Sequence, residues 1–151
     1  MMERSQLAKQ YFREGYSCAQ ALVLTFKDLI NLNEKDLLKI ASPFGGGMGR
    51  IRETCGALTG SFIVLGYLYG NPTSDIKKKE EIYVRVQEIA KKFIEVNGFM
   101  ACRKLLNLDH KIDQPKPEER SNDYYKKRPC LDIIASAAQI LDEYIKAHPL
   151  N

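Results

Sequence analysis

The 151-residue sequence has no tryptophan, only two histidines and only four cysteines. No two cysteines form a CxxC pair, and neither His110 nor His148 lies at zinc-finger spacing from a cysteine. A zinc finger built from one local stretch of sequence is therefore excluded. Any site that uses several of the cysteines must be assembled by the fold.

The sequence also lacks a long hydrophobic run. The longest apolar stretch, FIVLGYLYG at 62–70, is too short to span a bilayer and is interrupted by glycine. The first residues, MMERSQLAKQYFREG, are charged and have no apolar signal-peptide core. We therefore expect a cytoplasmic protein without a membrane partner, in a reducing compartment where structural disulfides are rare.

The net charge of +4 is small, and the basic residues alternate with acidic ones, as in SDIKKKEEIYVRVQEIAKK at 74–92. This mixture is typical of a solvated helix face with Glu–Lys pairs at helical spacing. No nucleic-acid-binding motif accompanies it. We therefore do not expect a nucleic-acid partner.

Apolar residues recur at helical spacing through nearly the whole chain, and no segment alternates as a half-buried strand does. We predict an all-α fold with one domain over residues 1–151, a bundle of about six helices. The helical pattern covers residues 3–14, 18–30, 34–41, 52–69, 73–96, 99–106 and 130–148, and the stretches 34–41 and 99–106 are short.

Residues 107–128 hold two prolines and many charges. They predict a long polar loop before the last helix, which acts as a lid or moves freely. We interpret Tyr124–Arg128 at its end as solvated rather than as a gate to Cys130.

Each cysteine falls in or near the first turn of a predicted helix. Cys18 follows Ser17, a good N-cap, and Cys130 follows Pro129, while Cys55 and Cys102 lie close to helix starts. Backbone N–H groups are unpaired there and the helix dipole is positive, which lowers the pKa of a thiol. Neighbouring arginines and lysines at three of the four sites add to this effect. We expect four thiolates, the form that binds metals and attacks disulfides.

Whether the four sulfurs meet is open at this stage. In a simple up-down bundle, successive helices start at opposite ends, so the cysteines would form two pairs about a helix length apart. Parallel neighbours, or short helices crossing at one end, would gather all four.

Two glycine patterns accompany the cysteines. In CGALTG, Gly56 and Gly60 stack on one helix face, where another backbone or a bulky cluster can approach closely. The stretch GGGMG at 45–49 can form a nest of amides for an anion, and it fits neither a phosphate loop nor a dinucleotide fingerprint. The cofactor-contacting glycines that we predict are Gly45, Gly46, Gly47, Gly56 and Gly60.

The ordered set of Cys18, CGALTG at 55–60, Cys102 and Cys130 resembles the C_GCAxxG_C_C family of redox proteins. These are small prokaryotic proteins with four cysteines and a CGAxxG motif, and the likeness covers most of the chain. It implies a redox role without a defined reaction. A similar domain occurs in some multihaem cytochromes, and this likeness implies an iron–sulfur centre as one expectation. This chain has no CxxCH site, so haem is not expected.

Four functions remain open. The first is a redox protein, an oxidoreductase or an electron-transfer accessory, in which all four cysteines bind an iron–sulfur cluster or another thiophilic metal. The second is metal-free thiol–disulfide exchange by pairs of the same cysteines. The third is a zinc-stabilised, non-catalytic interaction module, and the fourth is a helical protein whose cysteines only pack. A redox partner protein is expected for the first two, and the segment FIVLGYLYG suggests a homo-oligomer.

Overall fold

The computed structural model describes residues 2–150. Within this range the chain is helical and has no strand, which confirms the all-α prediction, although there are more helices than the six expected. They are α1 (Arg4–Arg13), α2 (Cys18–Thr25), α3 (Glu34–Ala41), α4 (Gly45–Met48), α5 (Gly56–Tyr69), α6 (Ile76–Asn97), α7 (Cys102–Leu105), α8 (Asn122–Lys127) and α9 (Cys130–Ala147), with 3-10 turns at Lys27–Leu29 and Ser42–Phe44.

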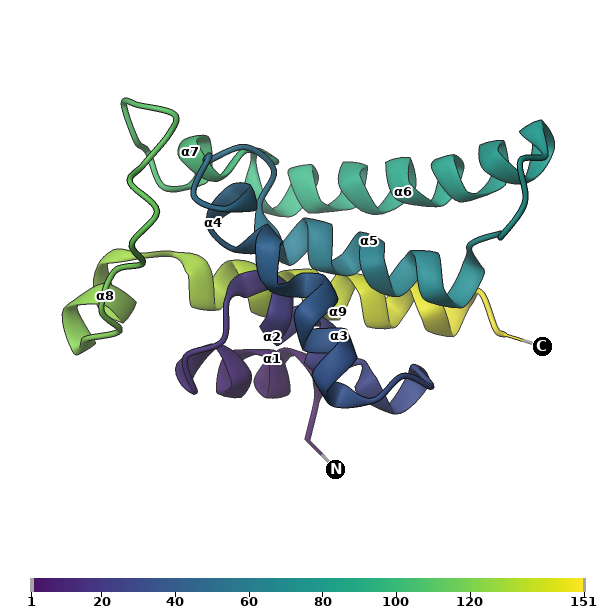
Figure 1. The fold of residues 1–151 in the computed structure, drawn as a ribbon, viewed down its shortest axis with the longest axis horizontal. Coiled ribbons are helices and arrows are strands. Elements are labelled where there is room, and N and C mark those ends of the chain that lie inside the picture. Colours follow the sequence, from purple (N-terminus) through teal and green to yellow (C-terminus); the bar gives the residue numbers. More distant parts are fainter. Residues whose placement is uncertain (1, 151) are drawn as a thin grey trace.

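The core lies between α1, α2, α5 and α9 (Figure 1). Helix α2 packs on α5 and α9 packs on α1, while the long helix α6 covers one side of α5 and α9. Phe12, Phe26 and Phe93 are completely or almost completely buried among these helices. No helix within residues 2–150 is long and apolar enough to cross a membrane.

The predicted boundaries hold where the sequence supplies a cap. Helix α3 spans the predicted residues behind an Asn33 cap, and Ser17 caps α2 in a reciprocal box with Gln20. Helix α5 starts at Gly56 rather than near Arg52. The start is later because Arg52 has a left-handed backbone (φ 65°) and Thr54 pairs with Ala101 in an isolated antiparallel bridge.

The connection between α5 and α7 brings distant helix starts together. Helix α6 runs antiparallel to α5 along its side, so α7 begins near the point where α5 begins (Figure 1). Helix α9 also begins at this end, because the chain passes around it through α8. The fold is therefore not the simple up-down bundle in which successive helices start at opposite ends.

The prediction of a loop over residues 107–128 is wrong for its C-terminal end, because residues 122–127 form helix α8, which Ser121 caps. Residues 107–121, called the strap below, have no regular structure but are fixed at several points. The guanidinium of Arg50 donates from Nε to the carbonyl of Gln114 (2.8 Å), and Arg120 donates to the carbonyl of Phe12 (2.8 Å). Arg128 pairs with Glu118 at 2.6 Å. The strap is therefore tied down by arginines.

Candidate functional site

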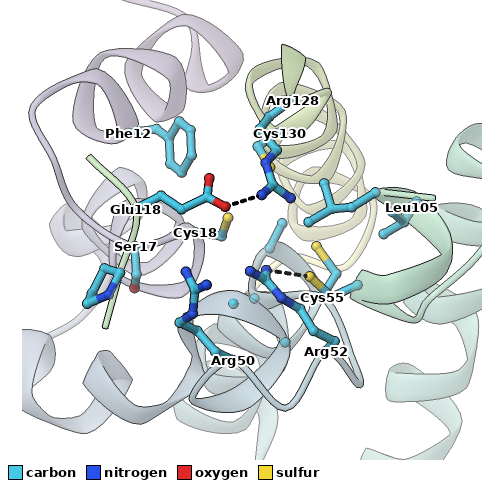
Figure 2. A pocket seen from close by; sticks show the side chains of 18 of the residues that line it. Phe12, Ser17, Cys18, Arg50, Arg52, Cys55, Leu105, Glu118, Arg128 and Cys130 are labelled. Atoms are coloured by element: carbon cyan, nitrogen blue, oxygen red, sulfur yellow. Dashed lines mark hydrogen bonds and ion pairs between the residues drawn. The ribbon is translucent and has the colours of Figure 1, made fainter. Parts of the chain in front are cut away.

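All four cysteines line one cavity of about 360 Å³ at the end of the bundle where these helices start. Figure 2 shows Cys18, Cys55 and Cys130 around it. Cys18, Cys102 and Cys130 are the first residues of α2, α7 and α9, and Cys55 caps α5. The predicted placement at helix starts is thus confirmed, and the fold gathers the four residues on one cavity.

The bridge between Thr54 and Ala101 positions two of the cysteines. Cys55 and Cys102 each follow a bridge residue, and both amides donate to backbone carbonyls of the opposite segment. Residues next to a bridge pair project to the same face, so both side chains point to the cavity side. They are diagonal neighbours across the bridge, and both are buried.

Cys18 and Cys130 form the other pair, and both are only partly buried. Hydrogen bonding between the two thiols is the largest influence on each, raising the pKa of Cys18 well above its ordinary value and lowering that of Cys130. Burial opposes the lowering at Cys130, while the positive charges of Arg128, Arg120 and Arg52 support it. Cys130 is therefore the thiol that ionises first, with Cys18 as its hydrogen-bond donor.

The other two thiols are held in the neutral form. Burial raises the pKa of Cys55 to about 12, and burial also raises that of Cys102, although a hydrogen bond from Arg52 opposes this. The expectation that helix starts keep all four cysteines ionised is wrong for Cys18, Cys55 and Cys102. For Cys55 and Cys102 the loss of solvation at the cavity wall raises the pKa and outweighs the local dipole and charge, whereas for Cys18 the hydrogen bond with Cys130 is the largest cause.

Arg52 is the arginine that reaches a buried sulfur. It is 4% exposed, and its Nη1 lies 3.5 Å from Sγ of Cys102. Its Nε donates to Asp113 of the strap at 2.8 Å, and His110 binds the other oxygen of that carboxylate at 2.6 Å. A chain of polar contacts thus connects the strap surface to Cys102. Arg103, the basic neighbour of Cys102 in the sequence, pairs with Glu53 instead.

Four of the five predicted glycines line the cavity, and the space around them explains why they are glycines. A Cβ on Gly47 would lie 2.6 Å from Cβ of Cys102, and one on Gly45 would lie 2.6 Å from Cβ of Ser17. A Cβ on Gly56 would meet Cβ of Cys18 at 3.0 Å. These positions let the backbone approach the cysteine-bearing helix starts.

Gly60 is placed differently from the prediction. It lies outside the cavity lining, where a Cβ would meet the carbonyl oxygen of Ala19 and Cβ of Leu22, each at 3.0 Å. Its role is close packing of α5 on α2. This packing holds Cys18 and Cys55 on adjacent helices.

The glycine-rich turn has an uncommon backbone. Gly46, Gly47, Met48, Gly49 and Arg50 are consecutive and all have φ between 61° and 71°. Left-handed geometry costs a residue with a side chain about 1–2 kcal/mol, so such residues usually occur singly. The run persists here because the cavity wall and the strap hold it. As a result, the side chains of Arg50 and Arg52 point into the cavity (Figure 2).

The strap and α8 contribute cavity residues that sequence reasoning did not identify. Glu118, Arg120, Tyr124 and Arg128 all line it. Burial raises the pKa of Tyr124 to about 12, and Arg120 lies over the rings of Phe12 and Tyr124. The interpretation of Tyr124–Arg128 as a solvated loop is therefore wrong for its two ends. No periodic pattern in the strap distinguished these charges from those of an exposed connection.

The described residues contain no group of three or more His, Cys, Asp or Glu side chains arranged to hold one metal ion. The cysteines are nevertheless close enough to influence one another, because ionisation of Cys55 or Cys102 would raise the pKa of Cys18 and ionisation of Cys130 would raise that of Cys102. The site is one sulfur-lined cavity without a preformed ion cage.

Comparison with known proteins gives two matches. The family model described as "Putative redox-active protein (C_GCAxxG_C_C)" matches residues 16–144. A protein of Archaeoglobus fulgidus described as "Uncharacterized protein" is 25% identical over 151 aligned positions, covering 92% of this chain and 93% of its own length. No solved structure matches the chain significantly.

Proposed function

The chain belongs to the C_GCAxxG_C_C family of redox-active proteins, and on that basis we propose that its four cysteines hold an iron–sulfur cluster that exchanges electrons with a partner protein. The observation that carries the proposal is the single cavity lined by Cys18, Cys55, Cys102 and Cys130. Four cysteine thiolates are the usual ligand set of two-iron and four-iron clusters. A reducing cytoplasm, where all four thiols stay free, suits this role.

The donor set and its surroundings fit such a cluster in two respects. A cluster with four thiolates carries net negative charge, and several arginines line this cavity. The cysteines also form two pairs from different elements, and each iron of a two-iron cluster takes two protein ligands. When bound, a cluster supplies one-electron transfer, and the hydrogen bond from Arg52 to Cys102 is a contact of the kind that tunes its potential.

A single zinc ion fits the site less well. Tetrahedral coordination at about 2.3 Å requires the four sulfurs to lie about 3.8 Å from one another. The described residues offer no three ligands in such an arrangement. We therefore derive no function from a mononuclear zinc site.

The Cys18–Cys130 pair supports a second candidate, thiol–disulfide exchange without metal. The thiolate of Cys130 would attack a disulfide sulfur of a partner and displace the other sulfur as a thiolate. Cys18 would then give up its proton and attack the mixed disulfide. This step forms a Cys18–Cys130 disulfide and releases the partner in its reduced form. The lowered pKa of Cys130 beside the raised pKa of Cys18 supports this order.

Anaerobic purification followed by iron and sulfide analysis and a visible spectrum separates the two candidates. For the cluster we expect a visible absorption band, iron and acid-labile sulfide, with most of the iron lost in each single Cys→Ser variant. Thr59→Ser, in the same motif but outside the cavity lining, is the control and keeps its iron.

A colourless protein that exchanges disulfides through Cys18 and Cys130, and not through Cys55 or Cys102, would support the second candidate instead. A colourless protein without exchange activity would contradict both.

A further inference from the structure

Positively charged side chains outnumber negatively charged ones in the lining of the cavity. Four arginines line it, with Glu118 as the only carboxylate in the lining within residues 2–150. Glu118 is itself paired with Arg128 at 2.6 Å, so its charge is neutralised. We propose that this cavity binds a small organic anion carrying a carboxylate, held by Arg50, Arg52 and Arg120 next to the cysteines.

Arg120 keeps its charge uncompensated. Its two terminal nitrogens donate to the backbone carbonyls of Phe12 (2.8 Å) and Tyr16 (3.1 Å), which are neutral acceptors. No ion pair with a carboxylate is found for it among the described residues. The guanidinium also stacks 4.1 Å above the Phe12 ring centre. These contacts fix its position at the cavity wall and leave its positive charge for a ligand.

Arg50 and Arg52 also line the cavity. In Figure 2 both guanidinium groups point into it, toward Cys18 and the Glu118–Arg128 pair. The ion pair of Arg50 with Asp113 is long, at 3.7 Å. Within residues 2–150, Nη2 of Arg52 has no hydrogen-bond partner, since Nε donates to Asp113 and Nη1 to Cys102. Both arginines therefore retain donors for an oxyanion.

The size and the remaining walls of the cavity indicate the class of ligand. A volume of about 360 Å³ lies in the range of small-molecule pockets, about 300–1,000 Å³. Apolar side chains complete the wall, namely Phe12, Leu105, Leu106 and Ile133. Guanidinium groups match the planar carboxylate through parallel hydrogen bonds. An organic acid with a short apolar body satisfies both kinds of surface.

In this proposal the arginines, and not the cysteines, hold the anion. Its assignment as a substrate or ligand of the redox centre rests on the proposed function. The two are separable, because the arginines can be changed while all four cysteines remain.

Calorimetric titration of the purified full-length protein at constant ionic strength tests the site. The probes are succinate, inorganic phosphate and neutral succinamide. We expect succinate to bind and succinamide not to bind. Arg50→Gln and Arg120→Gln should each weaken succinate binding about tenfold or more, because each removes a charged hydrogen bond. Lys92→Gln, an exposed residue of α6 with the same loss of charge, is the matched control and keeps the affinity.

Arg50→Lys, which keeps the charge, guards against a folding defect and should bind more tightly than Arg50→Gln. If wild type binds no succinate, or if the arginine variants match Lys92→Gln, the inference is wrong. If phosphate binds as tightly as succinate, the site recognises oxyanions in general, and the assignment of the ligand as a carboxylate is wrong. Iron analysis of the same samples reports on the redox centre separately: iron without succinate binding leaves the proposed function intact.

Discussion

At the scale of single residues, Arg52 combines several properties that rarely occur together. It is almost fully buried, has a left-handed backbone with φ 65°, and joins Asp113 of the strap to Cys102. A buried guanidinium requires compensation, which the Asp113 carboxylate supplies. The remaining positive field acts on Cys102, whose pKa burial raises and Arg52 lowers. Arg52 therefore influences how readily Cys102 accepts negative charge.

The cysteines should differ in reactivity in the reduced, metal-free protein. Cys130 has a lowered pKa and Cys55 a pKa of about 12, so Cys130 carries more thiolate than Cys55 at any given pH. We expect iodoacetamide to modify Cys130 first, with a rate that rises with pH and levels off at a lower pH than for the other cysteines. Mass spectrometry of the modified peptides measures this. The Cys18→Ala variant should shift the profile to higher pH, and equal labelling of Cys55 would contradict the assignment.

Only those parts of the site that depend on local sequence features could be predicted from the sequence. The four cysteines and four cavity glycines were identified because caps, motif spacing and glycine clusters are local features. Glu118 and Arg120 were not, because a charged residue in a non-periodic connection looks the same whether it is solvated or folded onto a cavity. The pKa directions also depend on burial, which the sequence does not specify for a helix start.

At the scale of helices, each cysteine is placed by what precedes it. A Ser17 cap precedes Cys18, Pro129 precedes Cys130, and the Thr54–Ala101 bridge precedes both Cys55 and Cys102. The caps were predictable, since one residue type at one position suffices. The bridge was not, because it joins segments 47 positions apart. Its absence from the prediction explains why α5 was expected to begin too early.

Loss of the Ser17 cap should reduce stability. Ser17→Ala removes the acceptor for the Gln20 amide and leaves that N–H unpaired, at a cost of about 1 kcal/mol. Urea denaturation measures the change in free energy of unfolding. Ser121→Ala, which removes the exposed cap of short α8, serves for comparison and should cost less. An equal or smaller effect at Ser17 would mean that α2 is held by packing alone.

Two glycine substitutions, one in the glycine-rich turn and one in α5, should change the free energy of unfolding in opposite directions. In Gly47→Ala the new Cβ would lie 2.6 Å from Cβ of Cys102 and 2.8 Å from Cα of Arg52, at φ 69°, so we expect a loss of several kcal/mol. In Gly66→Ala, at an exposed position of α5, the new Cβ meets nothing within 4 Å, and we expect a gain of about 0.4–1 kcal/mol. Thermal unfolding of both variants tests this. A tolerated Gly47→Ala would show that the turn does not press against α7.

At the scale of the whole molecule, the topology decides that the cysteines meet. Helical periodicity predicts helices but not which ends coincide, so one cluster and two distant pairs were equally compatible with the sequence. The length of α6, 22 residues, returns the chain to the start of α5. The path of the strap and α8 then starts α9 at the same end. Both are long-range arrangements that no local pattern specifies.

Attachment of the strap should depend on pH in both directions. The hydrogen bond from Arg52 lowers the pKa of Asp113, so its stabilisation is present above about pH 3.9 and is lost as the pH falls through the lower folded pKa. Asp109 and Asp113 raise the pKa of His110, so its contribution is present below about pH 6.5 and is lost as the pH rises through the higher folded pKa.

Hydrogen exchange of strap peptides, corrected for the intrinsic pH dependence, should therefore show the greatest protection at mildly acidic pH. Asp113→Asn should reduce this protection at every pH above 4. Asp109→Asn leaves the Arg52–Asp113 pair intact. The loss of strap protection at low pH should therefore be the same in this variant as in the wild type. A flat profile in the wild-type protein would mean that the backbone contacts alone hold the strap.

The left-handed run at residues 46–50 also bears on the order in which the chain folds. Its conformation is unfavourable on its own and has contacts to α7 and the strap as compensation, so these must be in place before it is stable. We expect the α1–α2–α5–α9 core to form first and the turn to close last. The cysteine sulfurs would then remain accessible to solvent until the turn closes. A metal ion or a reductant could reach them during this period.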